Sequence, residues 1–102
     1  MTTYIPISTQ LINHEKTNSV NARDLWQTLE IKKQFANWIK MQIESLGLEE
    51  NIDYVRFNQK VNANNATMRE YILTTDTAKG IAMASRTAKG NEVRKYFIHT
   101  NT

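Results

Sequence analysis

The chain has 102 residues and a formal net charge of +3, and it contains no cysteine. This length suits one packed domain over residues 1–102. The lack of cysteine excludes a disulfide framework, a thiolate nucleophile and a Cys-containing zinc site. The N-terminal "MTTYIPISTQ" has neither the basic segment nor the apolar run of a secretory leader, so we expect a cytoplasmic protein without a membrane span.

The charge is unevenly distributed along the chain. Residues 1–55 hold five Lys or Arg against seven Asp or Glu, whereas residues 56–102 hold eight against three. A basic excess of this kind attracts nucleic acid or an acidic partner without specifying a sequence to be read. Dispersed solubilising charge explains the same numbers equally well.

The first eighteen residues carry only weak patterns. Ile5 and Ile7, with Tyr4, flank Pro6 and suggest an edge strand, where proline is tolerated. Residues Thr9 to His14 suggest a short helical turn.

The next segment has clear helix-start signals. Asn21 can cap the first free amides of a helix that begins at Ala22, and Asp24 completes an acidic capping box. Val20 can pack on Leu25 as a hydrophobic staple. The apolar face of this helix holds Leu25, Trp26 and Leu29.

A second helix is predicted from about Lys33 to Leu46. Its apolar residues recur at helical spacing, and Gly47 supplies the left-handed position that ends many helices. The residues of the apolar stripe are Phe35, Trp38, Ile39, Ile43 and Leu46.

Beyond residue 50 the period changes from 3.6 to 2. Residues 53–59 and 69–74 alternate as strands of an antiparallel hairpin, joined by a polar loop over 60–67. A third helix should follow a cap at Thr74 or Thr75, with Ala78, Ile81, Ala82 and Met83 as its contact residues. A fourth should start at Thr87 and pack through Val93, Tyr96 and Phe97. The predicted fold is therefore a small α+β domain of about four helices with an antiparallel β-hairpin.

Enzymatic sites find no support in this pattern. His14 and His99 lie near opposite ends of the chain, outside any paired metal-ligand spacing. The acidic residues 49, 50 and 53 lack the glycine-bearing loop of a calcium site, and the three glycines are too scattered to cradle a phosphate. We expect no enzyme, no metal, no cofactor and no small-molecule substrate.

Direct DNA binding is a function that the sequence pattern leaves open. The first two helices are joined by a short turn, as in a helix-turn-helix arrangement, and basic side chains that could contact phosphate accompany them and the last helix. These nucleic-acid candidates are Lys32, Lys33, Lys40 and Lys95.

Several short motifs follow one another in order along the chain. They are "VNARDL" from Val20, Phe35-x-x-Trp38-Ile39, Ile43 with Gly47, Asp53-Tyr54, "EYILT" from Glu70, Ala78-Lys79, Ala82-Met83 and "RTAKGNEVRKYFI" from Arg86 to Ile98. Together they resemble the AntA/AntB antirepressor domain of temperate bacteriophages, with a core over about residues 20–98. That family is related to phage regulatory domains of the BRO-N and KilA-N type.

This resemblance implies a phage or prophage regulator in the bacterial host cell that binds a repressor protein and relieves repression, and no enzyme. BRO-N and KilA-N domains are associated with DNA binding, so a direct DNA-binding regulator is the alternative. An oligomerisation module of a longer antirepressor, with a homo-oligomer as its product, is another. The candidate partner-binding residues near family motifs are Arg23, Trp26, Arg86, Lys89 and Arg94.

Two departures from the family pattern matter. Trp26 stands where the pattern often has His, so no role of that His is carried over to this chain. Longer antirepressors also carry a further C-terminal domain, so residues 1–102 are expected to be either a free-standing version or a fragment.

Overall fold

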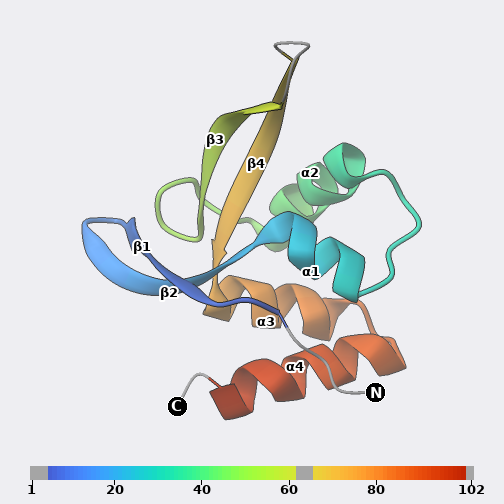
Figure 1. Cartoon of the computed structure of the whole chain (residues 1–102). Helices are drawn as coiled ribbons and strands as arrows, with labels where there is room; N and C mark the ends of the chain where they lie inside the picture. The colour runs from blue at the N-terminus through green and yellow to red at the C-terminus, as the bar shows by residue number, and fades with distance from the viewer. Residues whose placement is uncertain (1–4, 62–65, 101–102) are drawn as a thin grey trace.

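The computed structural model describes residues 5–61 and 66–100, which form four helices and four strands (Figure 1). In chain order these are β1 (Ser8–Ile12), β2 (Glu15–Asn21), α1 (Ala22–Thr28), α2 (Phe35–Leu46), β3 (Tyr54–Val61), β4 (Ala66–Thr74), α3 (Thr75–Ala84) and α4 (Ala88–Thr100). The strands pair antiparallel in the order β1-β2-β4-β3. The predicted α+β class is confirmed, although the predicted hairpin, β3–β4, is only half of the sheet.

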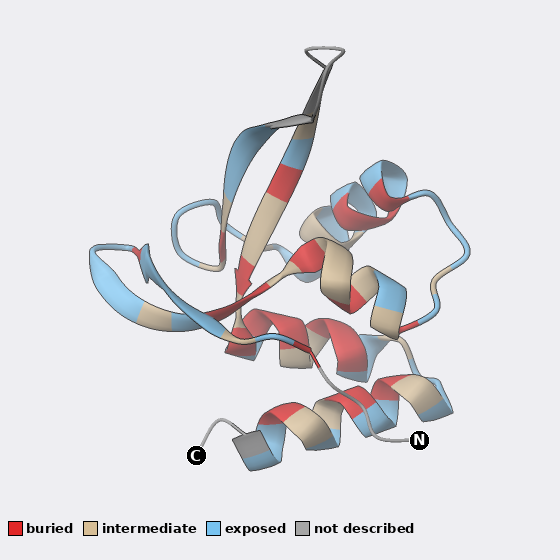
Figure 2. Cartoon of the chain, viewed as in Figure 1, coloured by how far each residue is buried: buried red, intermediate tan, exposed pale blue. Residues whose placement is uncertain are grey.

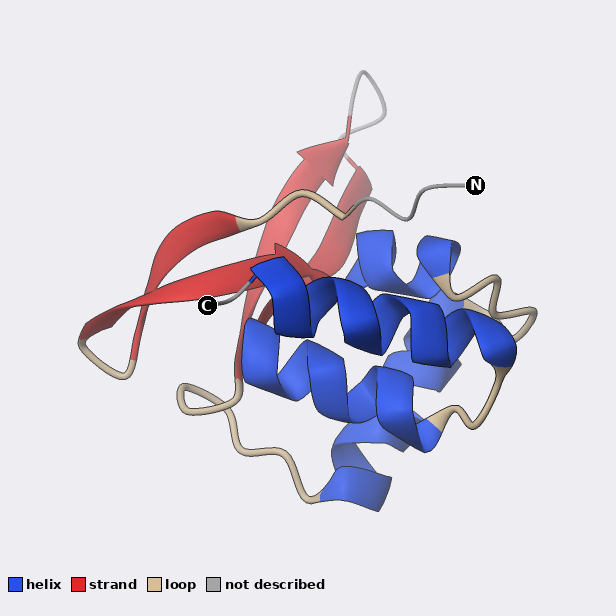
Figure 3. Cartoon of the chain, turned by 90° about the horizontal axis from the view of Figure 1, so that it is seen from below, coloured by secondary structure: helices blue, strands red, loops and turns tan. Residues whose placement is uncertain are grey.

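The helices gather on one side of the curled sheet (Figures 1 and 3). Buried residues concentrate where α1, α3 and α4 meet β2 and the lower part of β4 (Figure 2). One buried cluster draws on all four helices and on β2, β3 and β4, with Leu25, Leu73 and Phe97 among its most enclosed side chains. Within the described residues, no helix is long and apolar enough to cross a membrane.

β1 and β2 form a hairpin that was not predicted from the sequence. Ile12 pairs with Glu15, so Asn13 and His14 make a two-residue turn with φ values of 54° and 66°. Positive φ at both turn residues matches the right-handed twist of the flanking strands, and Asn tolerates it well. The helical turn predicted over Thr9–His14 is therefore wrong, because these turn residues reverse the chain instead of continuing a helix.

The predicted edge strand around Pro6 is also wrong where it is described. Residues 5–7 lie outside the strands, whereas Tyr4 lies outside the described residues. Ile5 is nevertheless fully buried, and the hydroxyl of Tyr96 donates a hydrogen bond to its carbonyl oxygen at 2.9 Å. This segment is held by α4 and not by a neighbouring strand.

The two predicted helix starts near residues 22 and 75 are confirmed with their caps. The side chain of Asn21 accepts a hydrogen bond from the backbone N–H of Arg23 at 2.7 Å. The hydroxyl of Thr74 accepts from the N–H of Thr77 at 3.0 Å. Both caps satisfy donors that a helix start leaves free.

α2 begins at Phe35, two residues later than predicted, and ends as predicted. Gly47 has a left-handed φ of 63°, and the N–H of Leu48 bonds the Ile43 carbonyl at 3.0 Å, as in a Schellman cap. Leu46 is 40% exposed, so the apolar stripe leaves the core before the helix ends.

The hairpin and the last two helices follow the prediction, with two qualifications. Residues 62–65 of the predicted polar loop lie outside the described residues, and its outer residues extend β3 and β4. Met83, predicted to be a contact residue of α3, is instead 53% exposed. Thr87 precedes α4 and its hydroxyl accepts from the N–H of Gly90 at 2.9 Å, as a cap should.

Gly90 lies on α4 against the C-terminal end of α3, and it gives a first testable prediction. A Cβ at this position would lie 2.6 Å from the carbonyl oxygen of Ala82 and would collide with the Ser85 hydroxyl. We expect Gly90→Ala to lower the free energy of unfolding by about 1 to 3 kcal/mol through overpacking, measured by urea denaturation.

Gly80 provides the matched control, because a Cβ there meets nothing within 4 Å. Gly80→Ala should raise stability, by up to about 1 kcal/mol, through helix propensity alone. Equal effects of the two substitutions would show that the helices are not tightly packed at Gly90.

Candidate functional site

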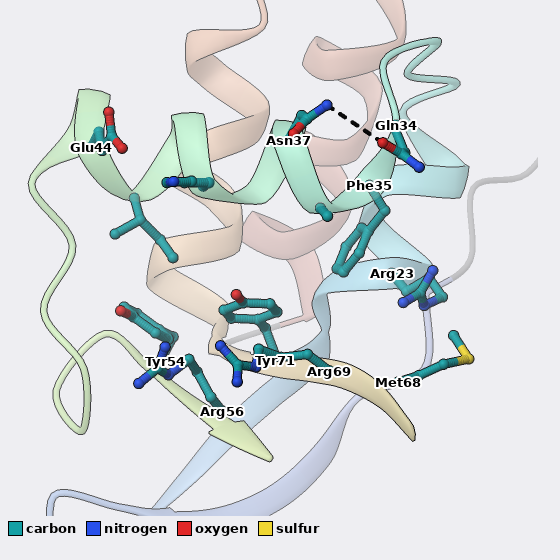
Figure 4. Close-up of a pocket in the computed structure, with 13 residues that line it drawn as sticks. Arg23, Gln34, Phe35, Asn37, Glu44, Tyr54, Arg56, Met68, Arg69 and Tyr71 are labelled. Carbon is teal, nitrogen blue, oxygen red and sulfur yellow. Dashed lines mark hydrogen bonds between the residues drawn. The ribbon is translucent and has the colours of Figure 1, made fainter. Parts of the chain in front are cut away.

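A groove lies between α2 and the β3–β4 hairpin, with a volume of about 820 Å³ (Figure 4). Gln34, Asn37 and Glu44 line it from the helix side, and Tyr71 and Arg69 from β4. Two other depressions on the described part of the chain have smaller volumes, of about 370 and 180 Å³.

Local periodicity explains which side chains reach the groove. Gln34, Asn37, Lys40 and Glu44 are spaced by three or four residues, so they share one face along α2. On the strands, alternate residues share a face, which places Arg56 beside Tyr54 on β3 and likewise groups Arg69 with Tyr71 on β4. The groove therefore forms where two regular faces oppose each other.

Aromatic rings form the floor of the groove. The ring centroids of Tyr54 and Tyr71 are 5.9 Å apart, and those of Tyr71 and Phe35 are 6.1 Å apart. Tyr54 and Phe35 are only 7% and 5% exposed, whereas Tyr71 is half-buried. Burial, with Glu50 as the second cause, raises the pKa of the Tyr54 phenol above its ordinary value. The floor is thus neutral and largely closed by its own packing.

Two of the four cations in the groove are held by carboxylates. The Nε and Nη2 atoms of Arg23 donate to Glu70 Oε2 at 2.9 and 2.8 Å, and its guanidinium lies 4.2 Å from the centre of the Phe35 ring. Arg56 pairs with Glu50 at 3.2 Å on the exposed rim.

The other two cations, Lys40 and Arg69, form no ion pair with any carboxylate among the described residues. Glu44, one helical turn after Lys40, is the single carboxylate among the lining residues, and no ion pair joins the two. The groove therefore has one unpaired cation on each wall, Lys40 on α2 and Arg69 on β4.

Residues 20–87 match the family described as AntA/AntB antirepressor. This chain belongs to the AntA/AntB antirepressor family. The match runs from the end of β2 to the residue before α4 and contains every residue that lines the groove. No curated protein and no solved structure matches the chain. The family is one of phage regulators and not of enzymes.

In this AntA/AntB domain, two of the candidate partner-binding residues hold the fold together. Arg23 links α1 to Glu70 of β4, as described above. The indole Nε1 of Trp26 donates to the carbonyl oxygen of Lys33 at 2.8 Å, and its ring contacts Phe35 edge-on at a centroid distance of 5.6 Å. Both side chains therefore make contacts within the domain that give them a structural role.

The other three partner candidates of the AntA/AntB domain belong to a separate region around α4. Arg86 lies exposed in the turn between α3 and α4 with a φ of 53°, and the Lys89 ammonium is 3.2 Å from Glu92. Arg94 is half-buried on α4. None of the three lines the groove, so the structure divides the five candidates between two regions.

The four nucleic-acid candidates are also divided by the fold. Lys40 lines the groove, whereas Lys32 and Lys33 line a smaller depression of about 370 Å³ beside Met41 and α3. Lys95 is exposed on α4. The four candidates therefore lie in three regions of the molecule: the groove, the smaller depression and α4.

Arg56 and Arg69 are groove residues that the sequence reading did not select. Strand alternation already indicated that Arg56 shares a face with Tyr54. Nothing local, however, indicated that this face opposes α2. Within the described residues, no group of three or more His, Asp or Glu side chains is placed to hold a metal ion.

Proposed function

We propose that this protein is a phage antirepressor that binds a repressor protein and prevents it from holding its operator. The observation that carries the proposal is the family match over residues 20–87, which includes the whole groove. The repressor acts on DNA in the bacterial host cell, which places the protein in the cytoplasm of that host.

The surface chemistry of the groove supports a protein partner. Interface cores are enriched in tyrosine and arginine relative to the rest of a protein surface. The half-buried Tyr71 and the unpaired Arg69 are such residues, and they neighbour each other on one face of β4. Arginine and tyrosine together are also frequent among the residues that dominate binding energy.

The direct test uses a repressor from the phage or prophage that encodes this chain, bound to a labelled operator. Adding the protein in molar excess should remove most of the repressor–operator band in a mobility-shift gel. An unrelated phage repressor on its own operator is the control and should stay bound. Full operator occupancy at saturating protein would rule out the proposal.

Direct DNA binding is the second candidate function, favoured by exposed lysines in the connection between α1 and α2. Lys32 and Lys33 are exposed beside the α1–α2 turn, and Lys40 follows on α2. Neutralising DNA phosphates releases counterions, so the affinity for DNA should fall steeply as salt rises. A mobility shift of phage regulatory DNA at low salt, lost at physiological salt, is the expected result. Absence of any shift at low salt would exclude this function.

A further inference from the structure

We propose that the groove between α2 and the β3–β4 hairpin binds a short, extended, acidic segment of the partner protein. The identity of that partner as a repressor rests on the proposed function, whereas the chemistry of the segment rests on the groove itself. Four observations support the inference: the charge of the walls, the state of the aromatic floor, the shape of the groove and its polar rim.

The charge of the walls favours carboxylates. Lys40 and Arg69 stand on opposite walls, and neither has an ion-pair partner among the described residues. Arg56 adds a third cation, whose pair with Glu50 is exposed on both sides, with side-chain exposures of 43% and 39%. Exposed pairs of this kind are weak, so a ligand carboxylate competes with Glu50 for Arg56 at little cost.

Glu44 sets a limit on where the acidic groups of the segment lie. It lines the groove close to the C-terminal end of α2, and no ion pair joins it to Lys40. A ligand carboxylate beside Glu44 would be repelled. The acidic side chains should therefore lie between Lys40 and Arg69, toward the start of α2.

The aromatic floor argues against single-stranded nucleic acid as the occupant. Proteins that bind single strands use exposed ring faces on which successive bases stack. Here Phe35 and Tyr54 are only 5% and 7% exposed, both pack against the Tyr71 ring, and the Arg23 guanidinium lies over the ring of Phe35. Tyr71, which is half-buried, is the remaining ring of the floor, and one ring does not make a stacking platform.

The shape of the groove argues against duplex DNA. Proteins that read a duplex insert a projecting helix or ribbon into its groove. The unpaired cations here instead line a hollow between α2 and the hairpin (Figure 4). Its volume of about 820 Å³ falls within the range of roughly 300–1,000 Å³ typical of sites that enclose a small ligand. A few residues of an extended chain fit such a space.

The rim offers hydrogen bonds for a peptide backbone. Gln34 and Asn37 are exposed at the start of α2, and their amides are joined by one long hydrogen bond of 3.4 Å. Each amide presents both a donor and an acceptor. An extended segment could replace this weak bond with its own N–H and C=O groups.

Fluorescence anisotropy with a labelled short peptide of alternating glutamate and leucine tests the inference on the full chain. The wild-type protein should bind it, and a peptide with lysine in place of glutamate should not bind. Lys40→Ala and Arg69→Ala should each weaken binding about tenfold, the loss expected for one hydrogen bond to a charged group. Lys16→Ala removes an exposed lysine of β2, outside the groove, and should leave binding unchanged.

Circular dichroism of each variant confirms that it is folded. Failure of the acidic peptide to bind, or equal binding by Arg69→Ala and the wild type, would overturn the inference. Labelled single-stranded and duplex oligonucleotides serve as competing probes. Tighter binding of either one, with the same dependence on Lys40 and Arg69, would assign the groove to nucleic acid instead.

The operator-release assay separates this inference from the proposed function. Release that is unchanged in Lys40→Ala and Arg69→Ala would overturn the groove as the repressor site while leaving antirepression intact. If the wild type binds the acidic peptide but never releases the operator, the proposed function fails and the groove chemistry stands. Loss of release in the two groove variants, with Lys16→Ala still active, supports both.

Discussion

Trp38→Ala should lower the free energy of unfolding by about 3 to 5 kcal/mol, the range for removing a large aromatic side chain from a core. Trp38 is 3% exposed in the first turn of α2, and its ring centroid lies 6.2 Å from that of Phe35. Truncation would leave a cavity directly beneath the helix that forms one wall of the groove. Urea denaturation followed by circular dichroism measures the loss.

Met41 is the matched control for this prediction. It lies on the same helix, three residues after Trp38, and is 40% exposed. Met41→Ala should change stability by less than about 1 kcal/mol, because surface substitutions rarely do more. If Trp38→Ala also costs less than about 1 kcal/mol, then α2 does not pack on the core through Trp38.

Arg23→Ala should lower the free energy of unfolding by about 3 kcal/mol. The Glu70 side chain is only 6% exposed and accepts from Arg23 at 2.8 Å, so the substitution leaves a buried carboxylate with its main partner missing. Asn21 also donates to Glu70, at 3.4 Å, but this longer bond is no replacement for a charged partner. The Arg23 side chain is 27% exposed, which keeps the expected loss at the lower end for buried pairs.

Three comparisons make the Arg23 prediction specific. Arg23→Lys keeps the charge but loses the two-atom contact to the carboxylate, so it should recover only part of the stability. Arg23→Ala combined with Glu70→Gln should cost less than the sum of the single changes, as expected for residues in direct contact. Arg94→Ala, on α4 and without a carboxylate partner in the described residues, should have a small effect.

The same variants decide between two roles for Arg23. It was a candidate for partner binding from the sequence, and the structure places it in an ion pair that joins α1 to β4. If Arg23→Ala were as stable as the wild type yet failed to release the operator, Arg23 would be a partner-binding residue. A loss of stability with release preserved at low temperature would assign it to the fold alone.

The groove shows how far the candidate site was predictable. Lys40 was selected from the sequence as a nucleic-acid candidate, and the structure places it on the wall of the groove. Arg69 was not selected, because only the packing of α2 over the hairpin brings the two within one groove. Arg23 and Trp26 were selected from the sequence as partner-binding candidates. Their hydrogen bonds to Glu70 and Lys33 are visible only in the three-dimensional structure.

Local signals in the sequence determined the helices and the β3–β4 hairpin. Asn21, Gly47 and Thr74 act on backbone groups within a few residues of themselves, so their effects are readable from the chain. Only the tertiary structure decided the β1–β2 hairpin, the pairing of β2 with β4 and the contact of Arg23 with Glu70, which is 47 residues away. β1 is exposed except at Ile12, β2 (7 residues) is exposed at Glu15, Lys16 and Asn18, and neither strand has an alternating apolar pattern. The positions of β1 and β2 in the sheet depend on turn geometry and on pairing with strands distant in sequence. Such interactions produce no periodic pattern of residues along the chain.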